Sequence, residues 1–315
     1  MRSDGNAFKS MTPRLALQLA APHTWAASVC PALFGDFYCW QKHLSLPLWK
    51  GCLLPVACIF LQSAVNTLND YFDYVKGTDT EEDHVEVSDA TLVYSHINPK
   101  SARRLGLVYL AAGAGTGLPA CIGSGWLPVM LGLVGAMVII LYSGGPLPLS
   151  YLPLGEIFSG FVMGGLIPLG TGLCADGSFH GDILFYSLPL ILGIGLIMMS
   201  NNGCDIEKDI AAGRKTLPVC LGREKTLILY RLVMLLWIIL IPIFSLLLTG
   251  PVISLICFGL LVIVAGKPIK DQLLLGLRAE ERILQMKGIN SCNIRINGIY
   301  ILSLILSLLL EVYHG

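Results

Sequence analysis

The chain has 315 residues, of which 54% are hydrophobic and only 13% charged, and its formal net charge is zero. A soluble domain carries about 25% charged residues, so the composition excludes an ordinary soluble protein and indicates an integral membrane protein. A balanced charge gives no reason to expect a nucleic-acid partner.

The N-terminal residues 1–12 are polar and lack the short apolar core and cleavage site of a signal peptide. We therefore expect a single membrane domain over residues 1–315, with a flexible segment at 1–12.

About nine apolar stretches follow, read with a window of roughly 20 residues. They cover residues 15–39, 46–72, 104–122, 126–143, 155–175, 182–202, 226–248, 251–266 and 294–312. The predicted fold is an all-α membrane protein with about nine transmembrane helices.

The loop charges predict the orientation of these helices. Of the 21 lysines and arginines, all except Lys42 and Lys50 fall on one side of the membrane when nine spans alternate. Because positive loops stay inside, the N-terminus is predicted to be cytoplasmic.

Three polar segments lie on that cytoplasmic side. Residues 74–103 and 208–225 are predicted to be loops that cap the bundle. Residues 267–293 mix leucines with charges, which indicates an amphipathic connecting helix at the interface.

Two acidic clusters, Asn66–Asp73 and Asn202–Asp209, end apolar spans on the cytoplasmic side. Carboxylates are costly near a bilayer and mark function when they occur there. Residues three and four apart on a helix share a face, so each cluster projects its polar side chains together, while Glu207 points away. These residues are Asn66, Asn69, Asp70 and Asp73 in the first cluster and Asn202, Asp205 and Asp209 in the second.

Oxygen-rich clusters of this kind favour magnesium, which takes one or two carboxylates plus phosphate oxygens and water. Two facing clusters could hold two Mg²⁺ ions with a diphosphate between them. A single such cluster could equally be a solvated helix end. Lys76, Arg214 and Lys215 follow the clusters and suit phosphate binding, although the positive-inside distribution would also place basic residues there.

The cysteines and histidines do not predict a second metal centre. The ten cysteines contain no CxxC pair, and the six histidines show no HxxxH or HExxH spacing. We therefore expect neither a disulfide framework nor a zinc or iron site.

The first cluster, followed by Gly77 and Asp79, resembles the first aspartate-rich motif of the UbiA superfamily of intramembrane prenyltransferases, and residues 205–222 resemble the second. The resemblance implies a helical bundle around a central cavity, with cytoplasmic cap loops and an opening to the lipid. It implies that Mg²⁺ is bound by Asp70, Asp73, Asp205 and Asp209. It also implies that substrate is contacted by Asn66, Asn69, Lys76, Tyr142, Asn202, Arg214 and Lys215.

Within the superfamily, residues 142–149, Leu154–Glu156, residues 88–93 and residues 98–100 resemble the MenA-type branch. That branch transfers a polyprenyl group from polyprenyl diphosphate to 1,4-dihydroxy-2-naphthoate, with loss of CO2 and diphosphate, in menaquinone biosynthesis. This implies a multi-pass protein of a bacterial cell membrane.

Two positions depart from the relatives: Ala90 stands where an arginine is frequent, and Tyr94 where an acid is frequent. They leave open another aromatic acceptor, such as 4-hydroxybenzoate, haem or a tetrapyrrole. A membrane transporter is the alternative from a different class.

Overall fold

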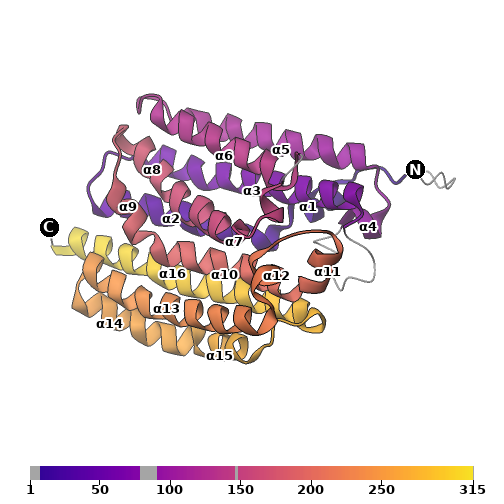
Figure 1. Cartoon of the computed structure of the whole chain (residues 1–315). Coiled ribbons are helices and arrows are strands. Elements are labelled where there is room, and N and C mark those ends of the chain that lie inside the picture. Colours follow the sequence, from indigo (N-terminus) through magenta and orange to yellow (C-terminus); the bar gives the residue numbers. More distant parts are fainter. Residues whose placement is uncertain (1–7, 79–90, 146–147, 315) are drawn as a thin grey trace.

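The protein is all-helical where the structure describes it. A computed structural model describes residues 8–78, 91–145 and 148–314 (Figure 1). Within these ranges there is no strand, only an isolated bridge between Lys9 and Ile97. The predicted all-α fold is confirmed. Residues 1–7 of the segment expected to be flexible lie outside the described residues.

The helices, in chain order, are α1 (Pro13–Ala20), α2 (Ala26–Gln41), α3 (Leu48–Lys76), α4 (Thr91–Ser95), α5 (Pro99–Ala120), α6 (Leu127–Ser143), α7 (Gly155–Ser159), α8 (Ile167–Asp176), α9 (Gly181–Tyr186), α10 (Leu188–Cys204), α11 (Ile206–Ala211), α12 (Leu217–Leu221), α13 (Arg223–Thr249), α14 (Pro251–Leu260), α15 (Gly266–Leu274) and α16 (Arg282–His314). Two π-helical turns, Gly160–Leu166 and Leu261–Ala265, join α7 to α8 and α14 to α15.

Several helical stretches are suited to cross a bilayer. Five are long and apolar enough: Leu48–Lys76, Gly155–Asp176, Arg223–Thr249, Pro251–Leu274 and Ala279–Tyr313. The helices α6 and α10 are shorter but also apolar. Large apolar side chains such as Leu133, Ile239 and Leu255 are exposed on α6, α13 and α14, as a lipid-facing surface requires. The chain is therefore a multi-pass membrane protein.

The predicted span 15–39 is not one helix. It is divided into α1 and α2 because Ala21 adopts a left-handed conformation, with φ of +47°, and Pro22 follows it. A left-handed residue ends an α-helix, and proline cannot supply the N–H needed to continue it. The span at 104–122 corresponds to α5, and its membrane crossing stays a prediction.

The polar segments are more structured than predicted. Residues 208–225 are not a simple loop, since they contain the end of α11, all of α12 and the start of α13. The single amphipathic helix expected over 267–293 is wrong. There α15 ends at Leu274, and α16 begins at Arg282. Between them Leu277 has a φ of +53° and reverses the chain direction.

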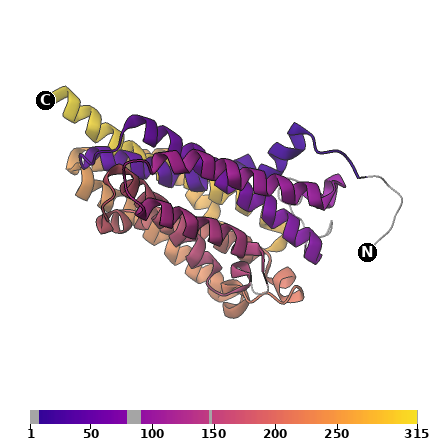
Figure 2. The same ribbon diagram turned by 90° about the horizontal axis from the view of Figure 1, so that it is seen from above.

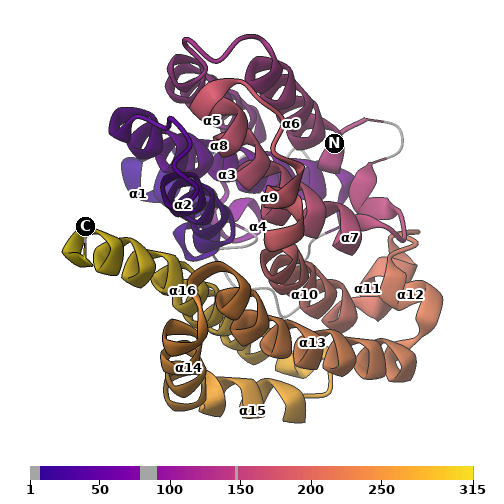
Figure 3. The same cartoon turned by 90° about the vertical axis from the view of Figure 1, so that its left-hand side faces the viewer.

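The long helices lie side by side in one bundle. Seen along the bundle, α5 and α6 form one edge and α13 to α15 the opposite edge (Figure 3), an order that Figure 1 also shows. Seen from above, the long helices run alongside one another (Figure 2). The helix α3 packs along α5, and α10 contacts both α13 and α16. The short helices α4, α11 and α12 gather at the end of the bundle nearest the N-terminus (Figure 1). That end carries both acidic clusters.

The turn Gly160–Leu166 approaches α10 closely because two of its residues lack a side chain. A Cβ atom on Gly164 would lie 2.5 Å from the backbone nitrogen of Ile191, and one on Gly160 would lie 2.5 Å from the Ile191 carbonyl oxygen. Small residues four apart are a general means of bringing membrane helices into backbone contact.

Gly164→Ala should therefore destabilise the protein by about 1–3 kcal/mol, because the added methyl group meets backbone that has no room to move. Thermal unfolding of the purified protein in detergent measures this. Gly132→Ala is the matched control, since a Cβ atom there meets nothing within 4 Å. Equal stability of the two variants would show that the close approach has no energetic role.

Candidate active site

The first acidic cluster occupies the last turns of α3. This helix continues through Lys76 and ends at Gly77, whose φ of +69° is favoured by glycine. Because the helix is uninterrupted, the spacing of three and four residues brings the four polar side chains to one face. Asn66, Asn69, Asp70 and Asp73 all line one cavity.

The second cluster lies at a break in the chain. The helix α10 ends at Cys204, and Asp205 leaves the helical conformation with φ of −101° and ψ of 17° before α11 begins. The single helical face expected for this cluster is therefore interrupted. Asn202 and Asp205 line the cavity, whereas Asp209 lies behind it, 1% exposed, and accepts a hydrogen bond from the Thr216 hydroxyl at 3.1 Å.

The cavity has a volume of about 330 Å³ and two kinds of wall. The two acidic clusters and their basic partners form the polar part. Apolar side chains line the rest, including Val162, Met163, Ile167, Ile194 and Ile197. A ligand that fits both walls has a charged head and an apolar tail.

Arg214 connects the two clusters. Its guanidinium donates a hydrogen bond to Asp73, lies 3.7 Å from Asp209, and stacks at 4.9 Å from the ring centroid of Tyr151. Burial disfavours the charged guanidinium, but Asp73 and Asp209 outweigh this effect and raise the pKa of Arg214 above its ordinary value. Burial raises the pKa of Asp209 to about 6, and the charge of Arg214 opposes the rise. Above about pH 6 the Asp209 side chain is therefore mainly an ionised carboxylate.

Arg282 pairs with Asp205 of the second acidic cluster. This contact was not predicted from the sequence. Arg282 is the first residue of α16 and is 5% exposed. Its Nε lies 2.9 and 3.2 Å from the two carboxylate oxygens of Asp205, and its Nη2 donates to Asn201 Oδ1 at 2.6 Å. No local pattern indicates this contact, because the two charges are 77 residues apart.

The asparagines chiefly order other groups. Asn69 donates to Asp73 at 3.0 Å and accepts a hydrogen bond from the Ser143 hydroxyl at 2.5 Å. Asn66 donates to the Ala20 carbonyl and the Thr24 hydroxyl, and thus ties α3 to the segment between α1 and α2.

Asn202 donates to Glu156 at 2.8 Å. Glu156 is 2% exposed, and its Oε2 is buried without a hydrogen-bond partner. In the sequence, Glu156 stands out only as part of the stretch Leu154–Glu156 that resembles the family, since a contact across 46 residues leaves no periodic signal.

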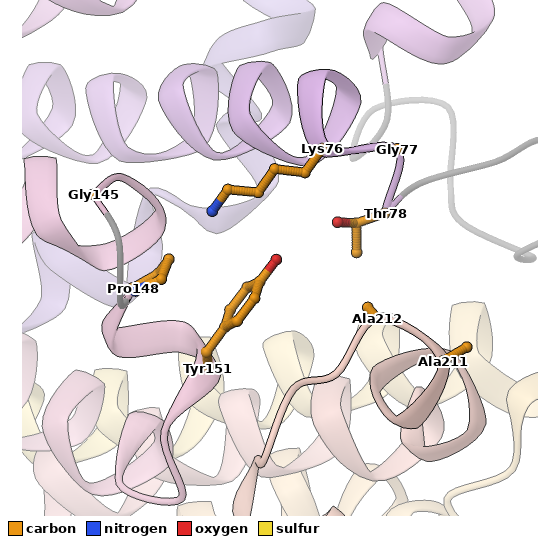
Figure 4. A pocket seen from close by; sticks show the side chains of 8 residues that line it. All are labelled: Lys76, Gly77, Thr78, Gly145, Pro148, Tyr151, Ala211 and Ala212. Carbon is orange, nitrogen blue, oxygen red and sulfur yellow. The ribbon is translucent and has the colours of Figure 1, made fainter.

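The basic residues that were predicted to bind phosphate lie at different places in the structure. Lys76 lines a second pocket of about 410 Å³ together with Thr78, Tyr151, Ala211 and Ala212 (Figure 4). Its ammonium group donates to the Ser143 carbonyl at 2.9 Å and lies 4.8 Å from the ring centroid of Tyr151. Lys215 is exposed and lines neither pocket. Tyr142 lines the main cavity, and its hydroxyl lies 3.6 Å from the Met198 sulfur.

Glu207 lies away from the cavity, as its helical position predicts. It forms two hydrogen bonds with Arg223, at 2.7 and 2.8 Å, and is 66% exposed. These contacts with Arg223 lower the pKa of Glu207. The two positions that depart from the family-like pattern do not help to identify the aromatic acceptor. Tyr94 is half-buried in α4, and Ala90 lies outside the described residues.

The sequence matches the UbiA prenyltransferase family over residues 28–272. The chain belongs to this family. It is 33% identical over 216 residues to a 1,4-dihydroxy-2-naphthoate octaprenyltransferase of Bacillus subtilis, an alignment that covers 69% of this chain and 68% of that protein. It is 30% identical over 224 residues to human UbiA prenyltransferase domain-containing protein 1, covering 66% of this chain and 61% of the human protein.

Solved structures of archaeal family members share the fold. A UbiA homologue from Archaeoglobus fulgidus bound to GPP and Mg²⁺ superposes with a TM-score of 0.62 at 18% identity, covering 93% of this chain and 99% of that one. The same homologue bound to DMAPP and Mg²⁺ gives a TM-score of 0.61. The family match over residues 28–272 and the relative at 33% identity make the chain a prenyltransferase rather than a transporter.

The donor set of this UbiA family member fits Mg²⁺ that shares its coordination with a phosphate ligand. Asp70 and Asp73 face the cavity from α3, and Asp205 faces it from the end of α10. Among the described residues, no group of three or more histidine, cysteine, aspartate or glutamate side chains is arranged to hold a metal alone. Mg²⁺ usually takes one or two carboxylates and completes its shell with phosphate and water. The ten cysteines are all free.

The contact between Asn202 and Glu156 should stabilise this enzyme by about 1–3 kcal/mol, because each polar group is buried and loses a partner when the other is removed. A double-mutant cycle of Asn202→Ala and Glu156→Ala, measured by unfolding free energy, gives this coupling directly. The exposed pair Glu207–Arg223 serves as the comparison and should couple by at most about 1 kcal/mol. A coupling for Asn202–Glu156 no larger than that of the exposed pair contradicts the expectation.

Proposed function

We propose that this enzyme transfers a polyprenyl group from polyprenyl diphosphate to 1,4-dihydroxy-2-naphthoate, with loss of CO2 and diphosphate, in menaquinone biosynthesis. The observation that carries the proposal is the single cavity in which two acidic clusters face each other beside an apolar wall. The name of the Bacillus relative supports the choice of acceptor. The archaeal structures with GPP and Mg²⁺ support the choice of donor.

The head of the donor would bind at the polar part of the cavity. We assign Asp70, Asp73, Asp205 and Asp209 to two Mg²⁺ ions. When bound, Mg²⁺ neutralises the charge that develops on the diphosphate as its bond to the prenyl group breaks. The basic side chains of Arg214 and Lys76 would bind phosphate oxygens of the donor. The exposed Lys215 would attract the diphosphate at the mouth of the cavity.

Asn69 and Asn202 would act through the carboxylates. Asn69 donates to one oxygen of Asp73 and fixes its orientation. Asn202 is held by Glu156 beside Asp205. Asn66 would fix the position of α3 against the N-terminal segment through its two donated hydrogen bonds. Charged groups that are already in position need not reorient as the transition state forms. This preorganisation is the main source of the rate acceleration in such sites.

The prenyl chain would lie along the apolar wall formed by residues such as Val162, Ile194 and Ile197. The rings of Tyr142 and Phe158 also line the cavity, where a ring face stabilises a nearby positive charge. As the allylic C–O bond breaks, its electron pair leaves with the diphosphate, and a carbon of the electron-rich naphthoate ring attacks the allylic carbon. The attacking ring carbon is the one that bears the ionised carboxylate, which then leaves as CO2; the electron pair of the broken C–C bond restores the aromatic ring, and no proton has to be removed.

The short helices α4, α11 and α12 would cover the reacting atoms and exclude water, which otherwise captures an allylic cation. Loop charges support a cytoplasmic N-terminus and a cytoplasmic mouth, and the Bacillus relative supports a bacterial cell membrane.

Purified enzyme with Mg²⁺ and a polyprenyl diphosphate should prenylate 1,4-dihydroxy-2-naphthoate in preference to 4-hydroxybenzoate, haem or a tetrapyrrole. Mass spectrometry of the lipid product identifies the acceptor, and the naphthoate product should lack the mass of CO2. A prenylated hydroxybenzoate as the main product would overturn the proposed acceptor while leaving the prenyl transfer intact.

Asp70→Ala and Asp205→Ala should each lower turnover by at least about 10²-fold, because each removes a charge aimed at the leaving group. Removal of Mg²⁺ by a chelator should have the same effect on the unmodified enzyme. Glu207→Ala is the matched control: its carboxylate belongs to the same sequence cluster but points away from the cavity, so turnover should be unchanged. Full activity of either aspartate variant refutes the two-metal assignment.

A further inference from the structure

The guanidinium group of Arg282 is hydrogen-bonded to the carboxylate oxygens of Asp205, the same atoms that a metal ion would bind. Its Nε lies within 3.2 Å of both oxygens of Asp205. Since Asp205 faces the cavity and is 8% exposed, little of the carboxylate remains accessible while the arginine is in place. A divalent cation that binds Asp205 must therefore displace this guanidinium at least in part.

The same arrangement occurs at the other cluster. Arg214 donates to Asp73 and lies 3.7 Å from Asp209, so carboxylates of both acidic clusters are paired with arginines from other elements. Buried carboxylates are costly when unpaired, and a guanidinium offsets this cost. The two guanidinium groups thus lie against carboxylate oxygens that a bound cation would also need.

The backbone of Arg282 is held while its side chain faces the cavity. Arg282, Met286 and Asn290 lie one turn apart on α16 and all line the cavity. Behind them, Gln285 donates to Tyr230 and Gln272 in a buried network at 3.1 and 2.8 Å. Glu281 accepts a hydrogen bond from the Gly276 N–H at 2.8 Å. The start of α16 is therefore fixed, and a change of partner needs only side-chain rotation.

We propose that Arg282 exchanges partners during the reaction cycle: it is the counter-ion of Asp205 in the metal-free enzyme and binds the diphosphate in the loaded enzyme. When Mg²⁺ takes the Asp205 carboxylate, the guanidinium turns to phosphate oxygens in the same cavity, which it can bind through two parallel hydrogen bonds. The proposal rests on the proposed function, because it requires a metal and a diphosphate in this cavity.

The exchange makes the binding of metal and diphosphate cooperative. Metal alone binds against the competing arginine, which then loses its two contacts with Asp205. Metal together with diphosphate gives the arginine a new partner. Because binding free energies are linked, each ligand then strengthens the binding of the other.

Arg282→Gln should therefore change two affinities in opposite directions. Mn²⁺ alone, titrated calorimetrically into the metal-free protein in detergent, should bind about tenfold more tightly than to the unmodified protein, because the competing charge is gone. A non-hydrolysable geranyl thiodiphosphate with saturating Mg²⁺ should bind about tenfold more weakly, because a phosphate ligand is lost.

Two further variants make the result decisive. Arg295→Gln removes an exposed arginine of the same helix that donates to the Val264 carbonyl at 3.0 Å outside the cavity, and neither affinity should change. Arg282→Lys keeps the charge and tests the geometry if the glutamine variant does not fold. It should bind Mn²⁺ as the unmodified protein does and the thiodiphosphate more weakly.

Weaker binding of both ligands to Arg282→Gln, or of both to Arg282→Lys, would mean that Arg282 only supports the fold and would overturn the exchange. Failure of the unmodified protein to bind Mn²⁺ at all would instead refute the metal site of the proposed function.

Discussion

The pairing of buried carboxylates with guanidinium groups is the interaction on which the site depends. Asp73, Asp205 and Asp209 are all buried at the end of the bundle, where unpaired negative charge costs several kcal/mol. Arg214 and Arg282 bring the opposite charge from elements that are distant in sequence. Two acidic clusters can therefore face one cavity only because cations lie among them. This constraint joins α3, α10, the segment after α11 and α16 into one unit.

The same constraint explains why the polar segments after the clusters are ordered rather than loose. Arg214 is held by Asp73 on one side and by the ring of Tyr151 on the other, so the residues between α11 and α12 lie against the cavity. Arg223 joins Glu207 to the Leu277 carbonyl, and this fixes the chain reversal before α16. The cover of the cavity is thus built from the charges that the acidic clusters require.

The sequence predicted those parts of the fold that depend on residues close together in the chain. Long apolar stretches located the helices, and the uninterrupted helix α3 allowed the spacing of Asn66, Asn69, Asp70 and Asp73 to place them together. The prediction was wrong at Asp205, where the helix breaks beside Gly203, the residue against which the side chain of Leu277 packs. Arg282 and Glu156 were missed because their partners are 77 and 46 residues away. The Lys215 side chain does not join that of Arg214 at the cavity, because neighbouring side chains on non-helical backbone point in different directions.

Both acidic clusters lie at the carboxyl ends of helices, since α3 ends at Lys76 and α10 at Cys204. Aligned peptide dipoles give such an end about half a negative charge, whereas most phosphate sites use the positive amino ends. The carboxyl ends of α3 and α10 therefore disfavour a bare anion. The amino ends of α4, α11 and α16 have the opposite sign and face carboxylates of the site: the Leu92 N–H lies 3.4 Å from both oxygens of Asp70, α11 begins directly after Asp205, and α16 begins at Arg282, which pairs with Asp205. Under the proposed function, a diphosphate would therefore enter this site together with its cations, because the carboxylates and the carboxyl ends of α3 and α10 disfavour the bare anion.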